Sequence, residues 1–115
     1  MKLRQIPIIS LALFALIFTT GCLDGGDGGG LIDVAKKQRA IDSCQSECRQ
    51  RRVVDDYSNG PCLSNSVQPD WVCDIAHKPR EEIDNEPQNQ CTDYIQDKAH
   101  HFVELDTSCN LIRAE

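Results

Sequence analysis

The sequence predicts a small, disulfide-rich α+β domain in which one long N-terminal helix packs on a short antiparallel sheet. Three observations predict this fold class: helical spacing of apolar residues over 31–52, strand-like alternation over 71–77, and seven cysteines in 115 residues. The length allows one small domain once a targeting segment is set aside, and we assign that domain to residues 31–115.

The first 22 residues have the layout of an export signal. Lys2 and Arg4 precede an apolar stretch at residues 6–18, and Thr19-Thr20-Gly21-Cys22 follows it. The apolar stretch is shorter than the about 20 residues that a membrane-spanning helix needs. We therefore expect a signal peptide over residues 1–21, with an uncleaved membrane anchor as the alternative.

The segment Thr19-Thr20-Gly21-Cys22 resembles the lipobox of prokaryotic lipoproteins. In that family small residues precede a cysteine that receives a lipid and becomes the mature N-terminus. Thr20 and Gly21 fit this pattern, whereas Thr19 stands where the family usually has an aliphatic residue. The resemblance implies a lipid on Cys22 and a location on the extracytoplasmic face of the cell membrane. The alternative is an ordinary cleavage site with Cys22 as a structural thiol.

Residues 22–30 are expected to be the lipidated cysteine and a flexible tether, because residues 23–30 contain five glycines. A phosphate-binding glycine loop is excluded, since no strand precedes the glycines and no Gly-Lys-Ser/Thr follows them. A Gly- and Asp-rich tether after a lipobox also resembles archaeal surface lipoproteins.

The charge of the chain argues against a nucleic-acid partner. The formal charge is −6, and without residues 1–21 the chain keeps 10 basic and 18 acidic side chains, a charge of −8. Phosphate binding requires clustered Lys and Arg, and anionic headgroups repel an acidic surface. We therefore expect membrane attachment to depend on the lipid and not on a basic patch.

The long helix is expected over residues 31–52. Arg49, Arg51 and Arg52 crowd its last turn, where positive charge complements the helix dipole. Its apolar stripe recurs at helical spacing and consists of Leu31, Val34, Ile41, Cys44 and Cys48.

The rest of the domain is expected to form a sheet with short helical connections. Residues 55–69 contain turn sequences and are expected to be a loop, and residues 71–77 a strand. A helical turn is expected around 80–83, a short helix over 92–99 with Tyr94 and Ile95 facing in, and a terminal hairpin from 102–105 and 110–114.

Cysteines are expected to stabilise this domain, because residues 31–115 contain only 20 large apolar side chains. With Cys22 assigned to lipid, the remaining six cysteines predict three disulfides. Cys44 and Cys48 lie one helical turn apart with parallel side chains, so we expect them in different bridges. Cys73 is the favoured partner for one of them, and the other pairings stay open. The six are Cys44, Cys48, Cys62, Cys73, Cys91 and Cys109.

Four residues are candidates for binding: Trp71, Asp74, His77 and His101. If the strands bearing His77 and His101 pair antiparallel, the two rings lie opposite each other and can bind a metal with Asp74 or Glu104. A zinc site using Cys44, Cys48, Asp74 and His77 is a second alternative. An oxidising compartment favours disulfides, so we expect no metal and no cofactor.

The function expected from the sequence is a lipid-anchored, extracytoplasmic binding or interaction module without catalytic residues. Its partners would be the membrane, through the lipid, and an envelope protein or small ligand. The alternatives are an envelope metal-binding protein using His77 and His101, and a hydrolase, although no ordered catalytic motif is present. Three segments resemble archaeal cell-surface proteins, a resemblance that carries over no function: Gly60-Pro61-Cys62-Leu63-Ser64, Asp70-Trp71-Val72-Cys73-Asp74 and His101-Phe102-Val103-Glu104.

Overall fold

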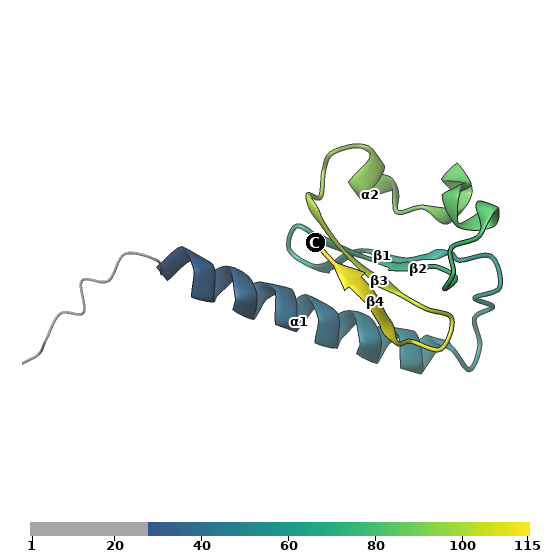
Figure 1. The fold of residues 1–115 in the computed structure, drawn as a ribbon, viewed down its shortest axis with the longest axis horizontal. Helices are drawn as coiled ribbons and strands as arrows, with labels where there is room; N and C mark the ends of the chain where they lie inside the picture. The colour runs from purple at the N-terminus through teal and green to yellow at the C-terminus, as the bar shows by residue number, and fades with distance from the viewer. Residues whose placement is uncertain (1–27) are drawn as a thin grey trace, which may run out of the picture.

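The computed structural model describes residues 28–115, which form an α+β domain (Figure 1). The expected signal peptide, the lipidation of Cys22 and most of the expected tether lie outside these residues. The described elements follow the order α1 (Gly28–Arg51), β1 (Cys62–Gln68), β2 (Trp71–Ile75), η1 (Glu82–Asn85), η2 (Pro87–Asn89), α2 (Thr92–Ile95), β3 (His101–Leu105) and β4 (Leu111–Ala114).

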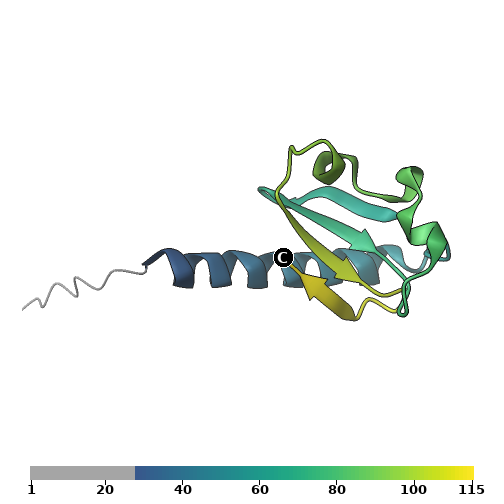
Figure 2. The ribbon, with the colours of Figure 1, turned by 45° about the horizontal axis from the view of Figure 1, so that its top comes forward.

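The four strands form one sheet in sequence order, with α1 on one face (Figure 1). Strand pairs β1–β2 and β3–β4 are antiparallel, which confirms a mostly antiparallel sheet beneath a long N-terminal helix. The central pair β2–β3 is parallel, and Trp71 is the register partner of His101. The connection through η1, η2 and α2 crosses the other face of the sheet and returns the chain to the end where β2 began (Figure 2).

Strand β1 corrects the expected loop over residues 55–69. Its Ser64-Asn65-Ser66 sequence has turn composition, but the segment pairs with β2 as an edge strand with two register irregularities. Leu63 is buried beneath α1, while Asn65 and Ser66 are exposed. Tertiary pairing therefore overrides the local turn preference.

The core lies between the sheet and the second half of α1. Alternation along β2 turns Trp71, Cys73 and Ile75 toward the helix, and they pack with Ala40, Cys44 and Cys48. A second, smaller cluster on the opposite face contains Val72, Cys91 and Ala99, packed with Cys62 and Phe102. The alternating side chains of the predicted strand thus face two different clusters, one on each side of the sheet.

The first half of α1 differs from the expected stripe, because Leu31 and Val34 are 79% and 66% exposed. A 24-residue helix is about 36 Å long, whereas a five-residue strand spans about 17 Å, so the sheet covers only part of α1. Both views show the start of the helix extending past the sheet (Figures 1 and 2). The helix also begins at Gly28, three residues earlier than expected, so the last three glycines of the expected flexible tether are helical.

Three disulfides join the elements and use all six cysteines of the described residues. Cys44–Cys73 ties α1 to β2, and Cys48–Cys109 ties α1 to the β3–β4 turn. Cys62–Cys91 ties β1 to the start of α2 on the other face. Cys44 and Cys48 therefore lie in different bridges, with Cys73 as the partner of Cys44, and neither thiol is free for a zinc site. Three disulfides in a domain of this size indicate an oxidising, extracytoplasmic location.

Candidate functional site

His77 and His101 lie at opposite ends of the β2–β3 pair, which corrects the expectation of two facing imidazoles. Because the strands are parallel, His101 at the start of β3 is level with Trp71, whereas His77 follows the end of β2. The metal alternative that used these two rings therefore lacks its geometry. Within residues 28–115, no group of three or more His, Cys, Asp and Glu side chains is arranged to hold a metal ion.

His77 belongs to a hydrogen-bonded cluster around the buried Asp84. The His77 ring lies 2.8 Å from Asp84 Oδ1, and the backbone N–H groups of His77 and Glu81 donate to Oδ2 at 2.9 Å. Burial opposes ionisation most strongly, but these hydrogen bonds hold the pKa of Asp84 below its usual range. Gly60 permits this approach, because a Cβ at that position would meet the Asp84 carboxylate. The cluster fixes the turn after β2, so His77 has a structural role here.

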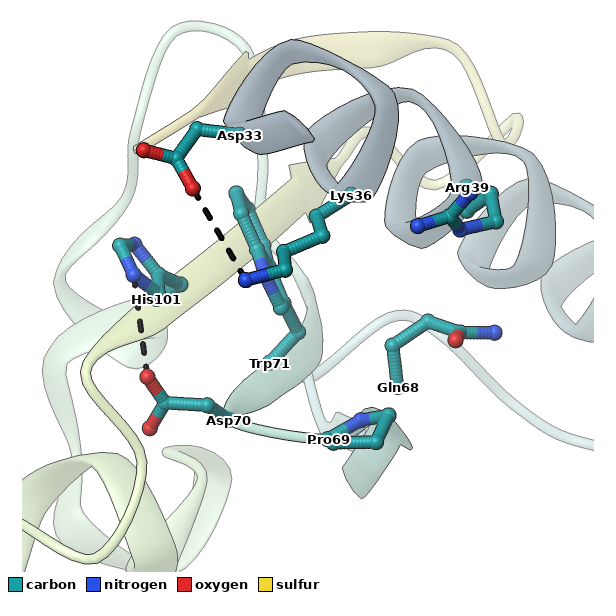
Figure 3. A pocket seen from close by; sticks show the side chains of 8 residues that line it. All are labelled: Asp33, Lys36, Arg39, Gln68, Pro69, Asp70, Trp71 and His101. Atoms are coloured by element: carbon teal, nitrogen blue, oxygen red, sulfur yellow. Dashed lines mark ion pairs between the residues drawn. The ribbon is translucent and has the colours of Figure 1, made fainter. Parts of the chain in front are cut away.

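Trp71 and His101 form one wall of an open groove (Figure 3). Their rings stack with centroids 4.6 Å apart and planes 18° from parallel. The groove has a volume of about 530 Å³ and lies where α1 runs past the sheet. Its lining comes from α1, the β1–β2 turn and the start of β3, and consists of Asp33, Lys36, Arg39, Gln68, Pro69, Asp70, Trp71 and His101.

Hydrogen bonds hold the β1–β2 turn in place at the groove. Gln68 Nε2 donates to Ser43 Oγ at 2.9 Å, which ties the end of β1 to α1. Asp70 has a φ of 70°, a conformation that Asp tolerates better than most residues, and accepts hydrogen bonds from the backbone and ring of His100. The His100 hydrogen bond lowers the pKa of Asp70, and the Asp70 carboxylate raises the pKa of His100.

The groove carries both signs of charge on exposed side chains. Lys36 Nζ lies 3.9 Å from Asp33, and His101 Nε2 lies 3.7 Å from Asp70 (Figure 3). These exposed pairs are weak and can exchange their partners for those of a ligand. Trp71 itself is only 6% exposed and therefore forms a firm wall rather than an open platform.

Asp74 lies in a second, smaller pocket on the face of the sheet away from α1. This pocket has a volume of about 160 Å³ and includes Glu104, Arg80, Arg113 and Phe102 in its lining. Glu104 is 6% exposed and pairs with Arg80 at 2.7 Å and with Arg113 at 3.5 Å. Buried Asp74 Oδ1 has no hydrogen-bond partner among the described residues.

The electrostatics of this pocket favour a protonated Asp74. Burial, together with the neighbouring Glu104 carboxylate, raises the pKa of Asp74 to about 8. Both arginines already pair with Glu104, which leaves Asp74 without an ion-pair partner at short distance. The pocket therefore holds a proton near neutral pH, and a perturbed carboxyl of this kind can mark a functional site or a structural charge network.

Comparisons with protein-family models, with curated proteins and with solved structures find no match to this chain. Among residues 28–115, no helix is both long and apolar enough to cross a membrane. The function must therefore be argued from the two pockets and from the chemistry of their residues.

The structure brings together residues that the sequence did not single out. Trp71 and His101 meet in the groove. The wall that α1 contributes, Asp33, Lys36 and Arg39, was not expected, because the position at which the sheet ends along α1 is set by tertiary packing and not by local sequence. Asp74 meets Glu104, Arg80 and Arg113 across three separate segments. Alternation alone places Asp74 on the face away from α1, but only the parallel register makes Glu104 its neighbour.

Proposed function

We propose that this chain is a lipid-anchored, extracytoplasmic binding module without enzymatic activity, and that the groove beside Trp71 binds a short polypeptide segment of another envelope protein. The observation that carries the proposal is the groove itself, which three elements line and which no segment of residues 28–115 fills. Its volume of about 530 Å³ lies within the range of ligand-binding clefts, about 300–1,000 Å³.

The anchor rests on the sequence Thr19-Thr20-Gly21-Cys22 and on the cysteine pairing. Six of the seven cysteines form disulfides, so Cys22 has no bonding partner among the described cysteines. An exported chain with one remaining cysteine directly after a signal peptide suits lipidation. The three disulfides support a location of the domain on the extracytoplasmic side of the membrane.

A polypeptide suits the groove better than a small enclosed ligand, because the groove is open and its charges alternate. Asp33 and Asp70 can meet basic side chains, Lys36 and Arg39 can meet acidic ones, and Trp71 and Pro69 offer apolar contact. The stacked Trp71–His101 pair and the Gln68–Ser43 hydrogen bond keep the wall pre-formed, which lowers the entropic cost of binding.

Site-specific photocrosslinking in the cells that make the protein tests this proposal. A photoreactive phenylalanine analogue replaces Lys36, which lines the groove, or Lys37, its exposed neighbour outside the groove. We expect one discrete adduct from position 36 and none of that mass from position 37. Adding Arg39→Glu, which reverses a charge on the groove wall, should reduce the adduct. Equal labelling from both positions, or no adduct from position 36, would show that the groove is not a binding surface.

A further inference from the structure

The first half of α1 is an exposed helix with an apolar side. Every residue from Gly29 to Arg39 is exposed, and Ala40 is the first buried residue of the helix. Three large apolar side chains occur in this stretch: Leu31, Ile32 and Val34, which are 79%, 55% and 66% exposed. Burial in the domain core therefore does not explain why these side chains are apolar.

Three of the four apolar residues between Gly29 and Arg39 lie on one side of the helix. With 3.6 residues per turn, Leu31, Val34 and Ala35 form one stripe, whereas Ile32 lies between Arg39 and Lys36 on the side of the groove. Asp33 lies on the opposite side, toward the groove that it lines with Lys36. The stripe ends at the exposed Gln38, and the exposed Asp42 follows on the same side one turn later. The apolar stripe thus faces away from both the groove and the sheet.

Basic side chains border the stripe. Arg39 and Lys36 follow it on one side, and Lys37 follows it on the other, so residues 28–40 contain three basic groups and one acid. This local charge of +2 contrasts with the strongly acidic chain around it. An apolar stripe flanked by Lys and Arg, with an acid opposite, is the pattern of helices that lie in a membrane interface.

We propose that residues 29–39 of α1 lie on the membrane surface, with Leu31, Val34 and Ala35 in the headgroup region and the groove turned away from it. This inference rests on the proposed lipid anchor at Cys22, which is only nine residues before Leu31. The anchor keeps the half-helix close to the membrane surface. This raises the effective concentration of lipid at the helix, so that weak apolar and electrostatic contacts suffice for binding. Anionic headgroups complement Lys37, which borders the stripe and does not line the groove.

The other end of α1 provides a matched control. Val53 and Val54 are 85% and 82% exposed and follow three arginines, so their composition resembles that of the first half of α1. They lie about one helix length from Gly28, about 36 Å along the axis. If apolar exposure alone determined membrane contact, position 53 would be as close to lipid as position 31.

Depth-dependent quenching tests the proposal. The chain from Cys22 to Glu115 carries a fluorescent amino acid in place of Leu31 or of Val53. It is anchored in phosphatidylcholine vesicles, with or without phosphatidylglycerol, that contain nitroxide-labelled lipid. We expect quenching at position 31 to exceed quenching at position 53 by at least about threefold, and more strongly with phosphatidylglycerol. Lys37→Glu, which leaves the groove lining unchanged, should reduce quenching at position 31 toward that at position 53.

A synthetic anchor separates this inference from the proposed function. Cys22 is coupled in vitro to a maleimide lipid, so the depth measurement does not depend on lipidation in the cell. Equal quenching at positions 31 and 53 of the coupled protein would overturn the membrane contact even if native Cys22 carries lipid. Protection of position 31 that requires a second copy of the chain, and not lipid, would assign the stripe to a dimer and also overturn it.

Discussion

Asp74 and Glu104 are register partners on the parallel strands β2 and β3, and only Glu104 has cationic partners at short distance. Arg80 and Arg113 both pair with Glu104, while Asp74 Oδ1 is buried without a partner. Two neighbouring carboxyl groups in a largely buried site do not both ionise readily. The consequence is that the domain should be sensitive to alkaline pH.

The first prediction is that stability falls as pH rises from about 4 to about 8. The raised pKa of Asp74, about 8, means that the folded state keeps a proton that the unfolded state has released. The free energy of unfolding therefore decreases through this window. Asp74→Asn should remove this decrease. Its effect on the free energy of unfolding should therefore be more stabilising at pH 9 than at pH 5, by about 2–5 kcal/mol. Urea unfolding of the oxidised protein at both pH values measures the difference.

The exposed Asp42→Asn is the control for this prediction, because it removes a carboxylate without touching the pocket. If the free energy of unfolding of Asp74→Asn depends on pH in the same way as that of the wild-type protein, Asp74 is already ionised at neutral pH.

The second prediction compares two disulfides of equal sequence separation. Cys44–Cys73 and Cys62–Cys91 both span 29 residues, so the chain-entropy contribution of each is about the same, roughly 3–4 kcal/mol. Cys44 and Cys73 are fully buried, whereas Cys62 is only partly buried. Replacing the first pair by alanines should therefore cost more than replacing the second, by about 1–2 kcal/mol, because it also leaves a cavity.

Chemical denaturation of the two double variants, with the other bridges kept oxidised, gives this ranking. Full reduction should unfold the domain under conditions where the oxidised protein is intact, since the apolar core alone is small. A reduced domain that melts at the same temperature as the oxidised one would contradict the role given to the disulfides.

The third prediction concerns Gly60, whose φ is 61°. An alanine there would be strained, and its Cβ would meet the Asp84 carboxylate that holds His77 and Glu81. Gly60→Ala should destabilise the domain by about 2–4 kcal/mol. Gly30→Ala is the matched control, because no atom lies within 4 Å of its Cβ and alanine favours a helix. Comparable losses from both variants, measured by thermal unfolding, would show that the Gly60–Asp84 contact carries no weight.

Local patterns in the sequence predicted the parts of the fold that depend on local structure. The long helix, the β2 alternation and the β3–β4 hairpin are all present, and the single direction of Cys44 and Cys48 on the helix correctly separated them into two bridges. Strand β1 was not predicted, because its Ser-Asn-Ser sequence becomes a strand only through pairing with β2.

The candidate site was predicted less completely, since it depends on long-range register. Strand alternation does not distinguish parallel from antiparallel pairing, so His77 was expected opposite His101 when its partner is Asp84. Likewise, helical spacing placed Leu31 and Val34 in the core, but the buried part of α1 begins only at Ala40. The extent of the sheet along α1 decides both the exposed half-helix and the groove, and no residue pattern within the helix encodes that extent.

The most direct test of the central claim is the intact mass of the protein extracted from the membranes of the cells that make it. We predict a chain that begins at Cys22, carries the added mass of a lipid, and gains six hydrogens on reduction. Cys22→Ser should abolish the lipid mass and move the protein out of the membrane fraction or leave its precursor uncleaved. An unmodified Cys22 in a membrane-bound protein, or a Cys22→Ser chain that is processed and retained normally, would contradict the lipid-anchored account.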